Sequence, residues 1–587
     1  MNTAELLVRC LENEGVQYIF GLPGEENLHL LQALKRSSIQ FITTRHEQGA
    51  AFMADVYGRL TGKAGVCLST LGPGATNLMT GVADANLDRA PLVAITGQVG
   101  TDRMHIESHQ YLDLVAMFAP VTRWNKQIVR PDATPEIVRK AFKVAQSEPP
   151  GAVHIDLPEN IADMSVKGVP LRNTPCELPV ASIESLQRAA IAISQASKPM
   201  ILVGNGAIRN RASEAITHFA QRFNIPVTNT FMGKGVLSYK DARSLWTVGL
   251  QQRDYIACAL DQSDLIIAIG YDLIEYGPKK WNPRGDLPIV HIALTPAEID
   301  SSYIPTVEVV GDISDALTEI SARAHRPSAG PAADSTGSST GSSTGSSTGS
   351  STASSTDNYT ADSLSKEFAS TREDMVLNYE QYSNDTGFPI KPQKLLYDLR
   401  QVLSPEDIVI SDVGAHKMWI ARHYHCERPN TCLISNGFAS MGIAIPGGVA
   451  AKLVHPNRKV VAVTGDGGFM MNCQELETAH RLGTPFVTII FNDGGYGLIE
   501  WKQESQFQES SYIKFNNPDF VKLAESMNLK GYRIESVEDF VPTLKEALSQ
   551  TVPTVIDCPI DYRENLLFSQ RAQALSCPLP PPQSAQP

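Results

Sequence analysis

The sequence predicts an α/β protein built from three doubly wound domains, each with a parallel sheet. Apolar, strand-like runs repeatedly end in glycine-rich or polar turns, and helical patterns follow those turns. The length of 587 residues agrees with several domains, because one hydrophobic core seldom serves so long a chain. In folds of this class, ligands bind at the sheet edge where the carboxyl ends of the strands meet.

The overall composition argues against some classes of partner. Hydrophobic residues make up 42% of the chain and charged residues 19%, which is ordinary for a globular protein. A net charge of −13 argues against nucleic acid or an anionic membrane, and no apolar run is long enough to span a membrane. Nine cysteines without a repeated spacing predict reduced thiols and a cytoplasmic setting. A helical pattern begins at Ala4–Glu14, with Thr3 as the expected N-cap, so we expect no signal or transit peptide.

The first domain is expected to span residues 1–165. Its predicted strands are Val16–Phe20, Phe41–Thr44, Gly65–Ser69 and Leu92–Thr96. Glu47 follows the second of these strands, at the start of a helical pattern. A glutamate in that position is most often a partner of the helix dipole, so the local pattern alone leaves its role open.

The second domain is expected at residues 183–325, with strands at Met200–Val203, Leu265–Ile269 and Ile289–Ala293. A linker at 326–385 follows. Its Thr-Gly-Ser-Ser repeat is too polar to bury a core, which predicts a flexible tether with a helical lead-in to the next domain. The proline-rich tail at 576–587 is expected to be disordered.

The last domain, expected at 386–562, contains the most informative stretch. Two β-branched or apolar runs, Val460–Thr464 and Pro485–Phe491, flank a helical segment at Cys473–Leu482. Each run ends in a polar glycine turn that carries a carboxylate, Asp466 in the first and Asp493 in the second. Because both turns follow parallel strands, we expect the two carboxylates to converge at the sheet edge.

Two converging carboxylates suit a metal bound to a phosphate group. A Gly-Asp-Gly turn alone would repel phosphate, but Mg²⁺ is usually held by one or two carboxylates together with phosphate oxygens. The amides of Gly467 and Gly468 and the following helix N-terminus would then face the phosphates. For the first turn alone, an ordinary glycine turn with an exposed aspartate is an equal alternative.

These residues also carry a resemblance. Gly-Asp-Gly followed after about 25 residues by Asn-Asp is similar to the motif of thiamine-diphosphate-dependent enzymes, and nearly the whole chain resembles the acetolactate synthases among them. The resemblance implies Mg²⁺ ligation by Asp466, Asp493 and the carbonyl of Gly495. Most of the family has asparagine where this chain has Asp493, but catabolic acetolactate synthases have the same pattern as this chain.

Other segments resemble further parts of that cofactor site. The segment RHEQGAAFMADVYGR implies that Glu47 faces the pyrimidine N1′ and activates the cofactor, and GPGATN implies Pro73 and Asn77 beside the pyrimidine. The loop SDVGAHK resembles a diphosphate-binding loop, and NGFASMG resembles the segment whose apolar side chain bends the cofactor. The remaining implied cofactor contacts are Val413, Gly414, Ala415, His416, Ala439, Met441, Gly467, Gly468 and Tyr496.

Substrate and flavin preferences rest on a few positions. Gln110 matches a glutamine that contacts the bound intermediate in acetolactate synthases, so we expect a catalytic role for it. The segment GYDLIEYGPKKWN resembles the corresponding segment of the flavin-free catabolic enzymes, which makes binding of FAD doubtful. Lys502, next to Trp501, stands where biosynthetic enzymes have a tryptophan that favours 2-oxobutyrate, so pyruvate is the expected acceptor.

The resemblance implies the reaction of two pyruvate molecules to 2-acetolactate and CO₂. In this family the two halves of the cofactor site come from different subunits, which implies a homodimer or homotetramer with Glu47 acting across a subunit boundary. Whether a small regulatory subunit binds, and whether the pathway is branched-chain amino acid biosynthesis or acetoin formation, stays open. The alternatives are another thiamine-diphosphate-dependent 2-oxo-acid decarboxylase or carboligase, or a non-catalytic binding protein on this fold.

Overall fold

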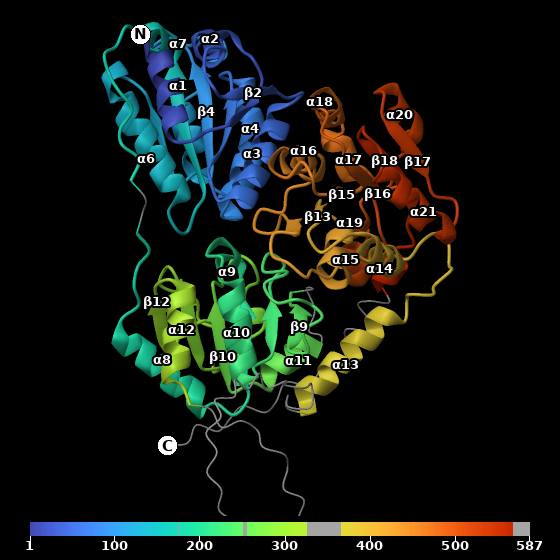
Figure 1. Cartoon of the computed structure of the whole chain (residues 1–587). Coiled ribbons are helices and arrows are strands. Elements are labelled where there is room, and N and C mark those ends of the chain that lie inside the picture. The colour runs from blue at the N-terminus through green and yellow to red at the C-terminus, as the bar shows by residue number, and fades with distance from the viewer. Residues whose placement is uncertain (175–176, 250–254, 326–365, 567–587) are drawn as a thin grey trace, which may run out of the picture.

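The computed structural model describes residues 1–174, 177–249, 255–325 and 366–566 (Figure 1). The Thr-Gly-Ser-Ser repeat and the predicted tail lie outside these described residues. Three six-stranded sheets are present, and every strand pairs with its neighbours in parallel, so the predicted fold class is confirmed. Within the described ranges, no helix has the length and apolar character needed to cross a membrane.

The first domain has the strand order β2-β1-β3-β4-β6-β5. Its strands are β1 Tyr18–Gly21, β2 Gln40–Thr43, β3 Gly65–Ser69, β4 Leu92–Gln98, β5 Trp124–Gln127 and β6 Ala152–Pro158. Its helices are α1 Thr3–Asn13, α2 Leu28–Leu34, α3 Glu47–Thr61, α4 Pro73–Leu87, α5 Leu114–Phe118, α6 Thr134–Gln146 and α7 Glu159–Asp163.

The central domain has the order β12-β11-β10-β7-β8-β9. Strands β8 and β9 lie on one side of β7, and β10, β11 and β12 follow on its other side. Its strands are β7 Pro199–Val203, β8 Val227–Asn229, β9 Ser244–Thr247, β10 Leu265–Ile269, β11 Ile289–Ala293 and β12 Val307–Val310. Its helices are α8 Ile183–Gln195, α9 Asn205–Arg209, α10 Ser213–Phe223, α11 Tyr255–Asp261 and α12 Ile313–Arg323, and α13 Lys366–Glu380 packs Phe368, Met375 and Tyr379 into the same core.

The last domain has the order β14-β13-β15-β16-β18-β17, which is the connectivity of the first domain repeated. Its strands are β13 Ile408–Ser411, β14 Cys432–Ile434, β15 Val460–Gly465, β16 Val487–Asn492, β17 Lys530–Arg533 and β18 Thr554–Pro559. Its helices are α14 Pro392–Val402, α15 Ala415–His423, α16 Ala444–Val454, α17 Asp466–Asn472, α18 Glu475–Leu482, α19 Gly497–Phe507, α20 Phe520–Ser526 and α21 Val537–Ala547.

The first and last domains share one hydrophobic core, which runs through α3 and α16 (Figure 1). Buried alanines of α3 and Val56 share this core with Ile443, Ala444 and Val449 from the last domain. The helices approach closely, because a Cβ at Gly447 would lie only 3.0 Å from Cγ2 of Val56. The two domains that resemble cofactor-binding modules are therefore packed together within one chain.

Three local expectations were wrong. Asn2, not Thr3, caps α1: its side chain accepts from the Glu5 amide while Glu5 accepts from the Asn2 amide, so the two form a capping box. The turn at Gly465–Gly468 is helical from Asp466 onward. Six described cysteines are free thiols, but Cys258 takes part in a disulfide, so the expectation of reduced thiols fails at that residue.

Candidate active site

Asp466 lies at the carboxyl edge of the last sheet, where buried β15 ends and α17 begins. Its side chain is 1% exposed. It accepts hydrogen bonds from the amides of Gly467 (2.8 Å) and Gly494 (2.7 Å) and from Nδ2 of Asn517 (2.7 Å). The bond from Gly494 links the two glycine turns directly, so the two strand ends meet as the sequence pattern predicts.

Asp493 lies beside Asp466 at the end of β16. Burial and the nearby Asp466 carboxylate raise the pKa of Asp493 to about 8. Its Oδ2 atom is buried and has no hydrogen-bond partner among the described residues. A Cβ at Gly497 would lie 2.5 Å from this oxygen, so glycine leaves the room that the carboxylate occupies. An unpaired buried carboxylate beside another is costly unless a cation binds the pair.

The neighbouring Asn492 is engaged elsewhere. Its Nδ2 donates to Oδ1 of Asp557 at 2.8 Å, and its Oδ1 accepts from Asn517 at 3.0 Å. Gly495 is buried, and its backbone hydrogen-bonds the Asp466 carboxyl. Asp493, rather than Asn492, is therefore the residue with a free oxygen next to Asp466.

The described chain contains no group of three or more His, Cys, Asp or Glu side chains arranged to hold a metal by themselves. The pair Asp466 and Asp493 would thus leave coordination positions open. This donor set suits Mg²⁺, which keeps substrate phosphate oxygens and water as ligands and seldom uses an all-protein cage.

His416 stands across from these turns, in the first turn of α15. Burial lowers the pKa of His416 to about 3, so the ring is neutral. Its Nε2 atom is buried and lacks a partner in the described structure. A Cβ at Gly414 would lie 2.7 Å from the ring carbon Cε1, and one at Gly465 would lie 3.3 Å from it. Both glycines therefore leave space around the imidazole, whose Nε2 atom is available to pair with a bound group.

The sequence argument missed Asp412, which links the strand ends. Its Oδ1 accepts from the amides of Val413 and Gly442, both at 2.7 Å, and its Oδ2 accepts from Oγ1 of Thr464 at 3.1 Å. Burial raises the pKa of Asp412 to about 6 although these donors favour the charged form. The residue fixes the start of the loop Val413, Gly414 and Ala415. Only its place after a buried strand could have pointed to it.

The remaining predicted contacts lie around the same edge. A Cβ at Gly467 would lie 2.8 Å from the ring of Tyr496, which packs edge-on to Phe515. A Cβ at Gly468 would lie 2.9 Å from Oγ1 of Thr464. Both glycines therefore permit close approach at the start of α17.

Glu47 is the first residue of α3 in the first domain. His46 caps this helix, because its Nδ1 accepts from the Gln48 amide at 3.1 Å. Glu47 is 8% exposed, and its Oε2 accepts from Nδ2 of Asn77 at 3.0 Å. A Cβ at Gly74 would lie 3.3 Å from the other carboxylate oxygen. The structure thus brings together Glu47 and Asn77, which the resemblance assigns to the pyrimidine.

The turn before α4 holds the other first-domain candidates. Pro73 is the first residue of α4, after Gly72 with a positive φ of 53°. Gln110 also has a positive φ, 58°, and its carbonyl oxygen would lie 2.7 Å from a Cβ at Gly72. Gln110 and Pro73 are therefore neighbours on the exposed side of this turn.

Side chains of the last domain reach the start of α3. Oε1 of Glu475 accepts from the amides of Arg45 and His46, both at 3.0 Å. Asn472 donates to the Gln48 side chain at 3.3 Å and to the Gly442 carbonyl at 3.0 Å. Asn472 thus connects the residue after Glu47 with the residue after Met441.

Thiamine diphosphate and Mg²⁺ fit the residues present. Oδ2 of Asp493 is a buried carboxyl oxygen without a hydrogen-bond partner, and Nε2 of His416 is a buried ring nitrogen without one. Bound Mg²⁺ would favour the ionised carboxylate, and a diphosphate oxygen would favour the ring tautomer that carries its proton on Nε2. In the first domain the carboxyl of Glu47 has only Asn77 as its hydrogen-bond partner in the described structure, which leaves capacity for a ring nitrogen.

Three family models match this chain in order. Residues 1–117 match the thiamine pyrophosphate enzyme N-terminal TPP binding domain, 186–320 the central domain and 412–558 the C-terminal TPP binding domain. An acetolactate synthase of Bacillus subtilis is 33% identical over 96% of this chain and 94% of that protein. A catabolic acetolactate synthase of Raoultella terrigena is 35% identical over 96% of both chains. A probable acetolactate synthase large subunit of Methanococcus aeolicus is 34% identical over 96% of this chain and 92% of that protein.

The chain belongs to the acetolactate synthase family of thiamine pyrophosphate enzymes. Thiamine pyrophosphate is the same compound as thiamine diphosphate. The matched family models cover parts of all three domains.

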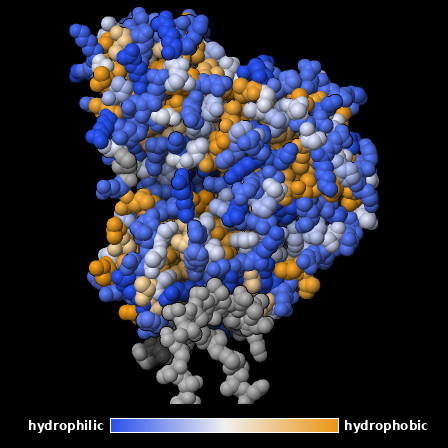
Figure 2. Space-filling model, in the orientation of Figure 1, coloured by the Kyte–Doolittle hydropathy of each residue, from blue (hydrophilic) through white to orange (hydrophobic). Residues whose placement is uncertain are grey.

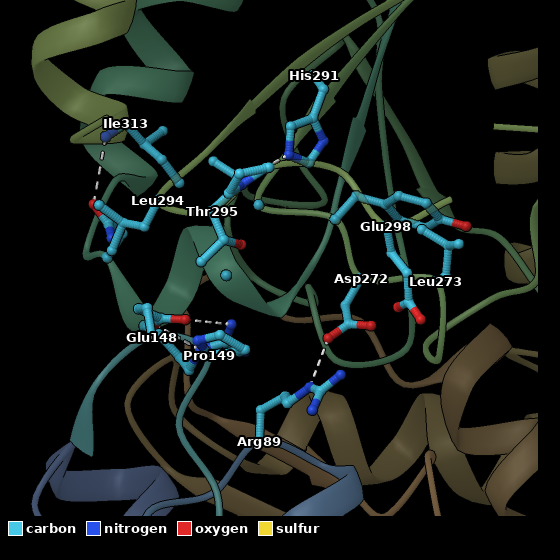
Figure 3. Close-up of a pocket in the computed structure, with 17 residues that line it drawn as sticks. Arg89, Glu148, Pro149, Asp272, Leu273, His291, Leu294, Thr295, Glu298 and Ile313 are labelled. Atoms are coloured by element: carbon cyan, nitrogen blue, oxygen red, sulfur yellow. Dashed lines mark hydrogen bonds and ion pairs between the residues drawn. The ribbon is translucent and has the colours of Figure 1, made fainter. Parts of the chain in front are cut away.

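The central domain of this thiamine pyrophosphate enzyme has a crevice of its own, with a volume of about 220 Å³ (Figure 3). Two ion pairs join the first and central domains here: Arg89 Nε to Asp272 Oδ2 at 2.7 Å, and Arg209 Nε to Glu148 Oε1 at 2.9 Å (Figure 3). Asp272 belongs to the segment GYDLIEYGPKKWN, whose sequence resembles that of flavin-free enzymes. These ion-paired side chains thus form part of the lining of the crevice.

The turns at the edge of the central sheet also leave little room for a nucleotide. The Gly206 amide donates to the Gly270 carbonyl at 2.8 Å, so the turns after β7 and β10 touch. The Glu275 carboxylate accepts from the Asn205 amide at 2.9 Å and from Oγ1 of Thr230. Burial raises the pKa of Glu275 to about 8. This carboxyl group already accepts the hydrogen bond from the Asn205 amide, which is the donor that a nucleotide phosphate would need.

The two residues linked to acceptor choice face different ways. Trp501 is half-buried against the core of the last domain, while Lys502 is exposed. Burial of part of its stem and the nearby Lys280 lower the pKa of Lys502.

Proposed function

We propose that this chain is an acetolactate synthase, which decarboxylates one pyruvate and joins the two remaining carbons to a second pyruvate. The single observation that carries the proposal is the site in which Asp493 and His416 keep unpaired buried atoms beside Asp466. Two of the relatives described above are named acetolactate synthases and the third a probable one, and each match covers 96% of this chain.

We assign Mg²⁺ to Asp466, Asp493 and the carbonyl of Gly495, and the diphosphate to His416, Val413–Ala415 and the amides of Gly467 and Gly468. Ala439, Met441 and Tyr496 complete the diphosphate side. The pyrimidine is assigned to Glu47, Pro73 and Asn77. When bound, thiamine diphosphate supplies a carbon nucleophile and accepts the electron pair as CO₂ leaves.

In this proposal the protein moves one proton and excludes others. Glu47, held by Asn77, exchanges a proton with the pyrimidine N1′ and so activates the cofactor. Gln110, exposed beside Pro73, orients the second pyruvate. Enclosure of the site keeps away the solvent proton that would divert the reaction to acetaldehyde.

We further propose a homodimer or homotetramer in which Glu47 acts across the subunit boundary. Large hydrophobic side chains are exposed next to site residues: Phe438 (44%), Met470 (46%), Met471 (41%), Tyr496 (39%) and Ile499 (50%). Figure 2 displays hydrophobic groups between hydrophilic residues on one face of the first and last domains. A partner subunit would cover such residues at a shared site. Pyruvate as acceptor and a cytoplasmic location complete the proposal.

We propose that FAD does not bind. Glu275, the contact between Gly206 and Gly270, and the ion pairs of Arg89 and Arg209 support this. Flavin absorbance in the purified protein, or tight binding of added FAD, would contradict it.

Pyruvate turnover with added thiamine diphosphate and Mg²⁺ tests the main proposal. We expect 2-acetolactate and CO₂ as products, and no turnover without the cofactor. Acetaldehyde without acetolactate would support a decarboxylase instead. Absence of thiamine diphosphate binding in calorimetry would support a non-catalytic binding protein, and a strong preference for 2-oxobutyrate would overturn the acceptor assignment.

A further inference from the structure

Asp84 of α4 reaches into the last domain and contacts the loop Ser435–Met441. The carboxyl is 0% exposed. Its Oδ1 accepts from Oγ of Ser435 at 2.7 Å and from the amide of Ser440 at 3.2 Å. One carboxylate oxygen thus joins the two ends of this loop.

Asp88, one helical turn further on, contacts the middle of the same loop. It is also 0% exposed. It accepts from the Asn436 amide at 3.0 Å and from the Gly437 amide. A Cβ at Gly437 would lie 2.8 Å from Oδ1 of Asp88, so the loop backbone lies directly against the carboxylate.

The loop needs such support because it contains a strained residue. Ala439 has a φ of 57°, a left-handed conformation that is unfavourable for a non-glycine residue. Conformations of this kind persist only where the surroundings determine them. The amides of Gly437 and Ser440, on either side of Ala439, are both bound by α4 carboxylates. Met441 follows directly.

A third carboxylate shares the same counter-ion without touching the loop. Arg59 pairs with Asp55 (2.5 Å), Asp84 (3.1 Å) and Asp88 (2.7 Å), and all three carboxylates are 0% exposed. Asp55 is hydrogen-bonded within the cluster, to Arg59 and to Asp84. Asp55 therefore matches Asp84 and Asp88 in charge, burial and ion pairing, and differs in having no bond to Ser435–Met441.

We propose that Asp84 and Asp88 are positioning residues of the first domain that hold the loop Ser435–Met441 in the shape required by the cofactor site of the last domain. The proposal rests on the proposed function for the role of Met441. The loop restraint itself is a property of the protein without cofactor. The pyrimidine-binding domain would thereby shape the diphosphate-binding domain of the same chain.

Hydrogen exchange measured by mass spectrometry on the cofactor-free full chain tests the restraint. Asp88→Asn and Asp84→Asn are compared with the control Asp55→Asn, and Ser435→Ala serves as a mild variant that leaves the ion cluster intact. We expect exchange of residues 436–441 to rise about tenfold in the Asp84 and Asp88 variants, about the effect of one lost charged hydrogen bond, and to stay near wild type in Asp55→Asn. Ser435→Ala should give a smaller rise, confined to this loop.

Calorimetric titration with thiamine diphosphate and Mg²⁺ provides the second measurement. We expect the dissociation constant to rise about tenfold in Asp84→Asn and Asp88→Asn, and to change less than about twofold in Asp55→Asn even if its melting temperature falls. Equal changes in all three aspartate variants, or an unchanged loop in Ser435→Ala, would overturn the positioning role. Failure of the wild type to bind the cofactor would instead contradict the proposed function, while hydrogen exchange would still decide the loop restraint.

Discussion

The last domain and the central domain each end two neighbouring parallel strands in glycine turns, but the two crevices differ in what fills them. In the last domain, Oδ2 of Asp493 and Nε2 of His416 are buried without partners. In the central domain, the Glu275 carboxyl group accepts from the Asn205 amide, and two ion pairs line the crevice (Figure 3). The first crevice thus holds an unpaired carboxyl oxygen and an unpaired imidazole nitrogen. In the second, these acidic groups are paired within the chain, although Nη1 of Arg209 is also buried without a partner among the described residues.

The difference between the two crevices shows that topology alone does not identify a ligand site. Sheet edges with suitable geometry occur in all three domains, and side chains decide which of them bind. Unpaired buried polar atoms are costly, so a chain keeps them where a bound group completes them. Glu275 illustrates the opposite case, in which a carboxyl takes the place of a phosphate.

Asp466→Ala should have the largest effect of the variants considered, because it removes the carboxylate at the centre of the last-domain crevice. We expect the affinity for thiamine diphosphate with Mg²⁺ to fall by more than about a hundredfold, beyond the usual loss from an outer metal contact, with activity lost in parallel. Calorimetry and pyruvate turnover measure these effects. Asp374→Ala, an exposed carboxylate on α13, is the control and should behave as wild type.

Glu47→Gln should separate cofactor binding from turnover. Glutamine keeps an oxygen for Asn77 but cannot exchange the proton, so kcat should fall by about 10²–10⁴ while cofactor affinity stays near wild type. Steady-state kinetics and calorimetry test this. Glu25→Gln, at an exposed position nearby, should leave both unchanged. Near-normal turnover in Glu47→Gln would contradict the assigned role.

Much of this comparison was visible in the sequence. The strands Gly65–Ser69, Leu265–Ile269 and Ile289–Ala293 match the structure residue for residue, because buried parallel strands are continuous apolar runs bounded by turns. The convergence of Asp466 and Asp493 followed from the same pattern. Helix α17 was missed, since its glycines have low helix propensity and tertiary contacts override it.

The unpredicted part consists of contacts between residues far apart in the chain. Asn517 binds Asp466 across 51 residues, and Asp84 binds Ser435 across 351. No pattern of neighbouring residues in the sequence predicts such pairs. Glu275 was unpredicted for the same reason: its partner Asn205 lies 70 residues away, so its burial depends on the completed fold.

Asp493→Asn should weaken the last-domain crevice only slightly. The amide keeps one oxygen for the metal and removes the repulsion from Asp466 that raises the pKa of Asp493. We expect Mg²⁺ affinity to change by less than about tenfold, in contrast to Asp466→Ala. Magnesium titration of activity measures this. A loss as large as that of Asp466→Ala would mean that the second carboxylate charge is essential.

Glu275→Gln should have the smallest effect on activity at neutral pH, and its effect on stability tests whether the edge of the central sheet carries a buried protonated carboxyl at a cost. The raised pKa lets Glu275 keep its proton in the folded chain up to about pH 8, whereas the unfolded chain loses it near the ordinary glutamate pKa of 4.5. The unfolded state therefore binds fewer protons over this range, so the stability of the wild type falls as the pH rises, by at most about 1.4 kcal/mol per pH unit. Glutamine does not titrate, so the melting temperature of the variant should rise relative to wild type between about pH 5 and pH 8, with Glu214→Gln, an exposed residue of α10, as control. Parallel melting curves for Glu275→Gln and wild type would mean that Glu275 is ionised in the folded chain and compensated by Arg209, and the central crevice would then resemble the last-domain one in holding a charge.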